Sequence, residues 1–133
     1  MADAFEFFID RSLGRHQVPR ALRAAGLTVH TMAEVYGELA GQRLKDEVWL
    51  EDVGRHGWIV LMKDDAIRRR PAERAALVAS AVRAFCLTNA QLRGAEQAER
   101  LVKNRHRIVA QSRRPGPYIY GVQANRIARL WPT

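Results

Sequence analysis

Two apolar runs along the chain are each followed by an aspartate that could bind a metal ion. Asp10 ends a short apolar run, Phe5–Ile9, and Asp64 follows a longer continuous apolar run, Trp58–Met62. Because the carboxyl ends of parallel strands meet at one edge of a sheet, both side chains are expected at that edge. Asp65, directly after Asp64, is a further candidate. The spacing therefore predicts an acidic edge on a parallel sheet.

A helix supplies the third acid of this set. One helical face carries four residues at spacings i, i+3, i+4 and i+7: Asp46, Trp49, Leu50 and Val53. The large apolar side chains must turn that face to the sheet, so Asp46 is expected at the site end of an inward face. Carboxylates that converge away from water repel one another unless a cation holds them. Oxygen ligands favour a hard ion, Mg²⁺ or Mn²⁺, which can polarise a phosphate.

Each of these acids also has an ordinary structural interpretation. Asp10 could cap the helix that follows it, and Asp46 could be a first-turn acid that the helix dipole favours. For any one acid the two interpretations stay open. The occurrence of all three at matching places favours the metal site.

Apolar runs and helical stripes alternate along the chain, which predicts βαβ units. Strands are expected at 5–9, 27–31, 58–62 and 84–89, with a final strand or ribbon between 118 and 131. Helices are expected from about 18 to 25, from about 43 to 55, from Pro71 onward, and as one long helix between about 95 and 109. The piece around Gly37 and Gly41 is expected to be a turn. The predicted fold is a three-layer α/β/α domain over residues 1–133, with a mostly parallel sheet of four to five strands.

Composition restricts the class of partner. The 133 residues carry a formal net charge of +8, from 22 Lys+Arg against 14 Asp+Glu. Such a surplus suits phosphate-rich partners, an anionic membrane or an acidic protein. The single cysteine, Cys86, excludes an internal disulfide and a CxxC metal site. No apolar run approaches the roughly 18 residues of a membrane span, and the opening residues do not form a signal peptide, so a cytoplasmic protein without membrane attachment is expected.

The order of these motifs resembles the PIN-domain superfamily of metal-dependent ribonucleases, in particular its compact toxin branch. Nearly the whole chain takes part, through the segments FFIDRSLGRHQVPRALRAAG, LKDEVWLEDVGRHGWIVLMKDD and AFCLTN. The resemblance implies that Asp10, Asp46 and Asp64 are catalytic and bind the metal. The chain departs from the family pattern at Met62-Lys63, where a Thr or Ser is usual. The usual fourth acid is also not plain, and Asp65 or Asn89 could stand in for it. Thr88 and Asn89, at the end of the fourth strand, are possible neighbours of the site.

The same resemblance implies a Mg²⁺- or Mn²⁺-dependent endoribonuclease, often a VapC-type toxin of a type II toxin–antitoxin pair. Its partners would be an RNA substrate and a cognate antitoxin protein, and a homodimer stays open. Basic residues close to the acids are expected to neutralise RNA phosphates, although a solvated basic surface is the ordinary alternative. These residues are Arg11, Arg15 and His16 after Asp10, and Arg68, Arg69 and Arg70 after Asp64.

Two other functions remain open at this point. A phosphoacceptor receiver domain, which is a signalling module, also has acids after its first and third strands and a threonine after its fourth, as Asp10, Asp64 and Thr88 would be. Receivers, however, carry an acidic pair after the first strand, whereas Asp10 is followed by Arg11. The second alternative is a catalytically inactive PIN-like domain that only binds RNA or a protein partner.

Overall fold

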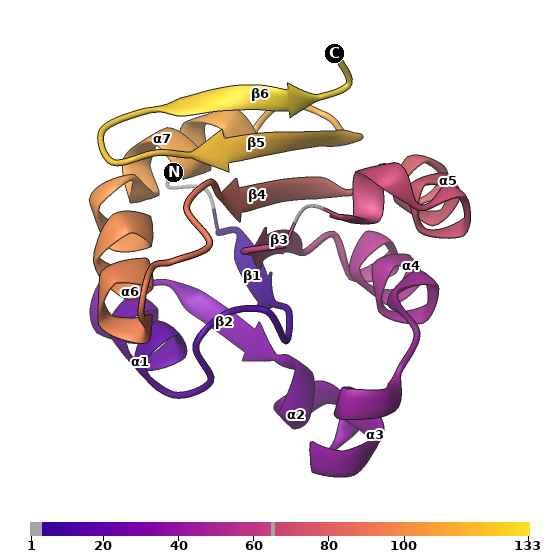
Figure 1. Cartoon of the computed structure of the whole chain (residues 1–133), viewed down its shortest axis with the longest axis horizontal. Coiled ribbons are helices and arrows are strands. Elements are labelled where there is room, and N and C mark those ends of the chain that lie inside the picture. Colours follow the sequence, from indigo (N-terminus) through magenta and orange to yellow (C-terminus); the bar gives the residue numbers. More distant parts are fainter. Residues whose placement is uncertain (1–3, 65) are drawn as a thin grey trace.

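The centre of the molecule is a six-stranded sheet in the computed structural model, which describes residues 4–64 and 66–133 (Figure 1). The strand order is β2-β1-β3-β4-β5-β6, and the first five strands run parallel. β6 pairs antiparallel with β5. The strand bounds are β1 (Glu6–Ile9), β2 (Thr28–Thr31), β3 (Ile59–Met62), β4 (Arg83–Leu87), β5 (Tyr118–Val122) and β6 (Ile127–Trp131).

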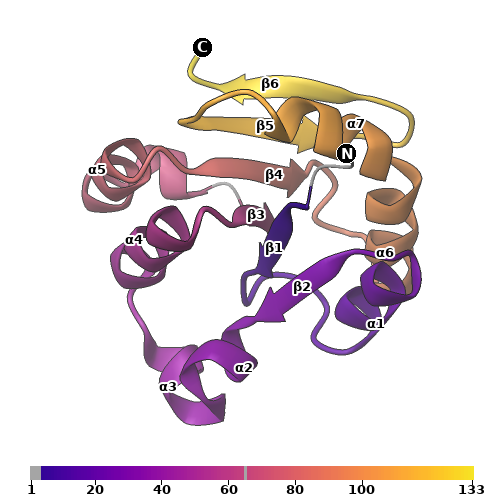
Figure 2. The ribbon, with the colours of Figure 1, turned by 180° about the vertical axis from the view of Figure 1, so that it is seen from behind.

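Helices cover both faces of this sheet, as the two opposite views show (Figures 1 and 2). α1, α6 and α7 lie on one face and α4 and α5 on the other, while α2 and α3 follow the end of β2. Their bounds are α1 (Gln17–Ala24), α2 (Met32–Tyr36), α3 (Glu38–Arg43), α4 (Asp46–His56), α5 (Pro71–Ala79), α6 (Gly94–Lys103) and α7 (Arg105–Ser112). A short 3₁₀ turn, Ala66–Arg69, precedes α5.

Alternate residues of the central strands enter two separate hydrophobic cores. Phe7 and Ile9 pack in the core under α1, α6 and α7, whereas Phe8 packs in the core under α4 and α5. All four residues of β3 are buried, as expected for a strand covered on both faces. The three-layer, mostly parallel α/β fold that the sequence predicts is therefore confirmed, with six strands in place of four to five.

The predicted turn around Gly37 and Gly41 is wrong, because this piece forms the short helices α2 and α3. A capping box begins α2, in which Glu34 N–H donates to the Thr31 hydroxyl and Thr31 N–H donates to the Glu34 carboxylate. Gly37 has φ +90°, a conformation that glycine tolerates, and it separates the two helices. At Gly41 a Cβ would lie only 3.0 Å from the Met32 side chain, so this glycine allows close packing of the two helices.

The predicted long helix is also divided, into α6 and α7, at Asn104. This residue is fully buried, and its side-chain amide donates to the carbonyls of Arg100 and Gln123, each at 2.9 Å. Asn104 thereby ties the junction of the two helices to the turn between β5 and β6. Ala98, Leu101 and Ile108 are buried, whereas Ala95 is exposed.

The order of the strands reverses between β1 and β3, and this point positions the acids. From β1 the chain continues to β2 on one side, and it later returns to β3 on the other side. In open α/β sheets ligands bind beyond the carboxyl ends of the strands at such a switch point. Asp10 follows β1 directly, and its N–H donates to the carbonyl of Leu61 in β3 at 3.1 Å. The two predicted acid-bearing strand ends are therefore neighbours.

Candidate active site

Asp10 is a buried carboxylate at the end of the central strand. Only 8% of the residue is exposed. Its Oδ1 accepts a hydrogen bond from the Ser12 N–H at 2.8 Å and a second one from the Ser12 hydroxyl. This is a local turn of the kind that Asp favours, and α1 begins only later, after His16. Asp10 is therefore not the cap of the following helix.

The Ser12 hydroxyl also joins the two acid-bearing loops. While it donates to Asp10, its oxygen accepts from the Lys63 N–H at 2.9 Å and from the Asp64 N–H at 3.4 Å. The loop after β1 is thus connected to the loop after β3 through one side chain. Sequence reasoning missed Ser12, although a serine two residues after an aspartate is a recognised turn pattern.

Burial raises the pKa of Asp10 from its ordinary value of 3.8 to about 6. The hydrogen bonds from Ser12 act in the opposite direction, because they favour the charged carboxylate. The negative charge of Asp46 raises this pKa further, and the positive charge of Arg11 lowers it. The structure therefore brings Asp10 and Asp46 within electrostatic reach of each other, as the sequence predicts.

Asp46 is the first residue of α4, and its neighbours hold it in place. Its Oδ1 accepts the indole N–H of Trp49 at 2.8 Å. Trp49 belongs to the inward face of α4, which is buried as expected. Two arginines flank the carboxylate at 3.7 Å each, Arg11 on the Oδ1 side and Arg70 on the Oδ2 side. Asp46 is thus a partly buried acid between two cations.

Glu73, which was not predicted, adds a further carboxylate. It lies in the first turn of α5, and its side chain is 14% exposed. Burial raises the pKa of Glu73, and the negative charge of Asp46 raises it further. The sequence offers only a weak signal for this residue, because an acid in a first helical turn is common without any role in a site.

The remaining predicted site residues lie at the same edge, where Asp64 and Asn89 contact their own loops and Thr88 contacts β5. Asp64 is exposed, and its Oδ1 accepts from the Ala66 N–H at 2.9 Å. At the end of β4, Thr88 Oγ1 donates to the Val122 carbonyl and Asn89 Oδ1 accepts from the Gln91 N–H. Asp65 lies outside the described residues.

The chemistry of these donors suits a hard divalent ion, because all of them are carboxylate oxygens. In residues 4–64 and 66–133, no three His, Cys, Asp or Glu side chains lie close enough together to hold one ion as they stand. The acids form two neighbouring pairs instead, Asp10 with Asp46 and Asp46 with Glu73. The side chain of Asp64 is tied to its own loop, so the predicted set of three is only partly assembled.

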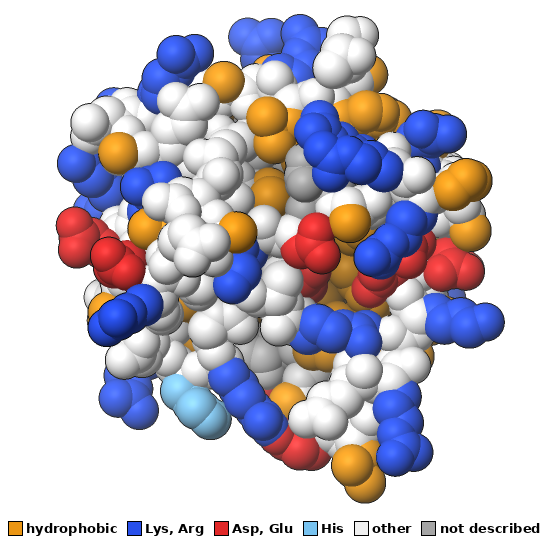
Figure 3. All heavy atoms as spheres, viewed as in Figure 1, with side chains coloured by type: hydrophobic (Ala, Val, Ile, Leu, Met, Phe, Trp, Pro, Cys, Tyr) orange, Lys and Arg blue, Asp and Glu red, His pale blue; other side chains and the backbone are white. Residues whose placement is uncertain are grey.

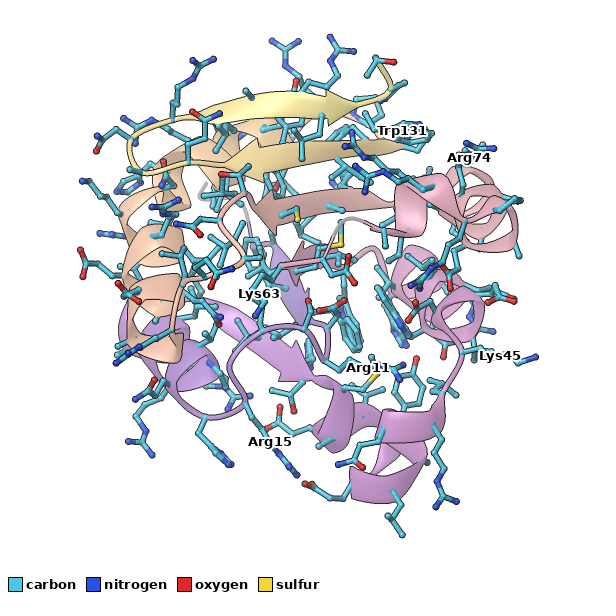
Figure 4. All side chains as sticks on the ribbon, viewed as in Figure 1. Arg11, Arg15, Lys45, Lys63, Arg74 and Trp131 are labelled. Carbon is cyan, nitrogen blue, oxygen red and sulfur yellow. The ribbon has the colours of Figure 1, made fainter. Side chains whose placement is uncertain are left out.

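A pocket of about 770 Å³ adjoins Asp10 between α1 and the α2–α3 pair. Its lining contains three of the predicted basic residues, Arg11, Arg15 and His16. Figure 3 shows acidic side chains near the middle of this face with Lys and Arg side chains around them. In Figure 4, Arg11 and Lys63 lie near the centre of the face and Arg15 lies farther out.

Several of these cations are held by protein groups. Arg11 donates to the carbonyls of Gln42 and Leu44, and Arg15 forms an ion pair with Glu38. Arg68 donates to the carbonyl of Leu130 at 3.1 Å. The basic rim is therefore partly structural.

Comparison with known proteins decides the family. The family model described as "PIN like domain" matches residues 5–89, which is more than half of the chain. The chain belongs to the PIN-like domain family. Over 130 residues it is 38% identical to a protein of Mycobacterium tuberculosis named "Putative ribonuclease VapC45", covering 98% of this chain and 94% of that one. The comparison with solved structures gave no match.

This PIN-like assignment confirms the predicted family and excludes the receiver-domain alternative. The strand order alone could not do so, because β2-β1-β3-β4-β5 is also the order of flavodoxin-like sheets. Nucleases of the PIN family generally depend on a divalent metal ion. Among the described residues, no helix has the length and apolar character needed to cross a membrane.

We expect Asp10→Asn to stabilise the metal-free protein at neutral pH but not in acid. Folding raises the pKa of Asp10 to about 6, so the charged carboxylate lowers the free energy of unfolding. This penalty is complete above that pH and disappears as the pH falls toward 4. The gain at about pH 7.5 should be at most about 3 kcal/mol and should nearly vanish at about pH 4. Urea unfolding at the two pH values measures it.

Asp64→Asn is the matched control, because Asp64 is exposed and asparagine can accept the same hydrogen bond from Ala66. It should change stability little, and equally at both pH values. If Asp10→Asn raises the free energy of unfolding as much in acid as at neutral pH, the buried charge of Asp10 is not the cause.

Proposed function

We propose that this protein is a metal-dependent endoribonuclease and the toxin of a type II toxin–antitoxin pair. The observation that carries the proposal is the buried Asp10 at the sheet switch point, with Asp46 beside it and a pocket with a basic rim next to it. The name of the mycobacterial relative, a VapC-type ribonuclease, agrees with the nuclease class expected from the sequence.

Asp10, Asp46 and Asp64 would hold the metal ion, which we propose to be Mg²⁺ or Mn²⁺. The chemistry that such an ion supplies is polarisation of a phosphate and activation of a water for hydrolysis. A modest movement of Asp64 is required, because its side chain is tied to the Ala66 N–H. Since Asp64 is exposed at the end of a loop, its side chain can make this movement at little cost.

The residues around the acids orient them for this role. Ser12 holds Oδ1 of Asp10, and Trp49 holds Oδ1 of Asp46. Such neighbours fix the direction in which a ligand oxygen points and support its affinity for a metal. Because the pKa of Asp10 is raised by burial, bound positive charge would favour its charged form and lower that pKa.

Metal-dependent cleavage of RNA is the direct test. The purified protein should cleave single-stranded RNA with Mg²⁺ or Mn²⁺, and excess EDTA should abolish cleavage. Asp10→Asn and Asp64→Asn should each lower the rate by at least about 100-fold while circular dichroism shows a native fold, because only a ligand charge is lost. Cleavage that persists in EDTA would refute the metal site.

An inactive wild-type protein that still binds RNA would instead favour the alternative of a catalytically inactive PIN-like domain. Asn89→Ala is a useful companion variant. Asn89 lies at the same sheet edge, and its side-chain oxygen accepts a hydrogen bond from the nearby Gln91 N–H. The cleavage rate of Asn89→Ala therefore tests whether Asn89 belongs to the site.

The RNA is proposed to lie along the edge that contains the acids and the adjoining pocket. Arg11, Arg15 and His16 line this pocket. Arg68 and Arg69 lie in the 3₁₀ turn after Asp64, and both have interactions within the protein. Contacts of this kind position a phosphate backbone and do not read the base sequence.

RNA affinity should therefore fall steeply with salt, because neutralised phosphates release counterions. In the Asp10→Asn background, which prevents cleavage, Arg69→Gln should weaken binding and reduce the slope of log affinity against log salt by about 0.7–1. Fluorescence anisotropy with a labelled single-stranded RNA measures both quantities.

Arg114→Gln is the matched control for this measurement. Arg114 is exposed between α7 and the start of β5, and strand starts lie at the edge opposite the acids. Its loss should leave the slope nearly unchanged. Equal slopes for both variants, or an affinity that does not depend on salt, would exclude the proposed RNA path.

A cognate antitoxin protein is the proposed partner, since an unrestrained ribonuclease damages its own cell. The net charge of +8 suits an acidic partner. The proposed place of action is the cytoplasm. A homodimer stays a prediction.

Expression in bacteria tests the toxin assignment. The wild-type chain alone should arrest growth, and Asp10→Asn should relieve the arrest at equal protein level because it removes a proposed metal ligand. Co-expression with the small protein encoded beside it should restore growth and yield a complex on purification. If wild type and Asp10→Asn are equally harmless, the toxin assignment fails.

A further inference from the structure

We propose that Arg70 is an internal counter-ion of the active site. It neutralises Asp46 and Glu73 and holds them together until a divalent ion binds and neutralises them in its place. The inference rests on the proposed metal site and adds two residues to it. Glu73 supplies a further carboxylate beside Asp46, and Arg70 is a positioning residue. The three side chains are joined by two ion pairs, in both of which Arg70 supplies the positive charge.

The geometry places one cation between two acids from different helices. Arg70 Nη1 lies 3.7 Å from Oδ2 of Asp46, at the start of α4, and 3.4 Å from Oε2 of Glu73, in the first turn of α5. Asp46 and Glu73 thus share one cation. The starts of α4 and α5 are therefore brought together by one arginine that precedes α5.

Exposure differs sharply among the three side chains. The carboxylates of Asp46 and Glu73 are 23% and 14% exposed, whereas the Arg70 side chain is 57% exposed. Two carboxylates that are largely removed from water and lie beside the same cation would repel each other without that positive charge. The arginine is therefore the member of the group that solvent reaches most easily.

The pairing of Arg70 with Glu73 alone would be an ordinary surface contact. Two residues spaced i, i+3 at a helix start often pair, and such exposed pairs contribute little to stability. The contact with Asp46 is different, because Asp46 lies 24 residues earlier and is a proposed metal ligand. Arg70 therefore holds an acid of the site in place, through long and exposed contacts that a divalent ion can replace.

Thermal unfolding with and without Mn²⁺ tests this role without any measurement of cleavage. Arg70→Gln should lower the Tm of the metal-free protein by roughly 2–5 °C, because the two acids lose their counter-ion. It should also tighten Mn²⁺ binding by about three- to tenfold, because the ion no longer competes with the arginine. Isothermal calorimetry measures that affinity.

Three further variants isolate the cause. Arg70→Lys keeps the charge and should resemble the wild type in both measurements. Adding Glu73→Gln to Arg70→Gln removes one of the repelling acids and should restore most of the lost Tm. The matched control is Arg74→Gln, since Arg74 lies on α5 away from Arg11 and Lys63 (Figure 4), and its guanidinium donates to the Arg68 carbonyl at 3.4 Å. It should leave the Mn²⁺ affinity unchanged and lower the Tm less than Arg70→Gln does.

The inference is overturned if Arg70→Gln and Arg74→Gln have the same Mn²⁺ affinity and the same Tm. This failure is distinguishable from failure of the proposed function. If the wild type binds Mn²⁺ and Asp10→Asn does not, the metal site stands and only the role of Arg70 is lost. If Asp10→Asn binds Mn²⁺ as the wild type does, the proposed function itself fails, and this inference fails with it.

Discussion

The active edge of this protein depends on how a buried carboxylate is accommodated at the end of its central strand. Asp10 is almost inaccessible, and another acid, Asp46, is close enough to disfavour its charge. A folded protein accepts such a group only if nearby dipoles or cations compensate it. Ser12 supplies two hydrogen bonds and Arg11 supplies positive charge. The loops after β1 and β3 are organised around this requirement.

The rest of the fold makes the edge rigid enough for that compensation to work. Strands β1, β3 and β4 are buried on both faces, so the positions of their ends are determined by two cores. On the α4 face, the ring of Phe8 stacks on that of Trp49 with a centroid distance of 5.4 Å. The indole N–H of the same tryptophan holds Asp46. Core packing and the orientation of a proposed metal ligand thus depend on one side chain.

Sequence patterns predicted those parts of the structure that depend on local periodicity. The apolar runs at β1, β3 and β4 and the inward face of α4 are found where expected, and so are Asp10 and Asp46. Patterns could not predict Asn104, because its role is a bond to a turn 19 residues away in the chain. The pairing of Glu73 with Asp46 is equally non-local. α2 is a different case, because its capping box, Thr31 with Glu34, can be recognised in the sequence, whereas the two nearby glycines indicated a turn.

Several of the arginines that could attract RNA are already paired with groups of the protein. Arg11 donates to two carbonyls and lies near Asp46. Arg15 is paired with Glu38, and Arg70 is paired with two acids. A cation already paired with a carboxylate contributes little to the field that attracts RNA, because the two charges cancel at a distance. If an acid of such a pair bound the proposed metal ion, its arginine would become available to the phosphate backbone. Metal binding and RNA binding would then reinforce each other, since the charge that the ion replaces becomes available to the substrate.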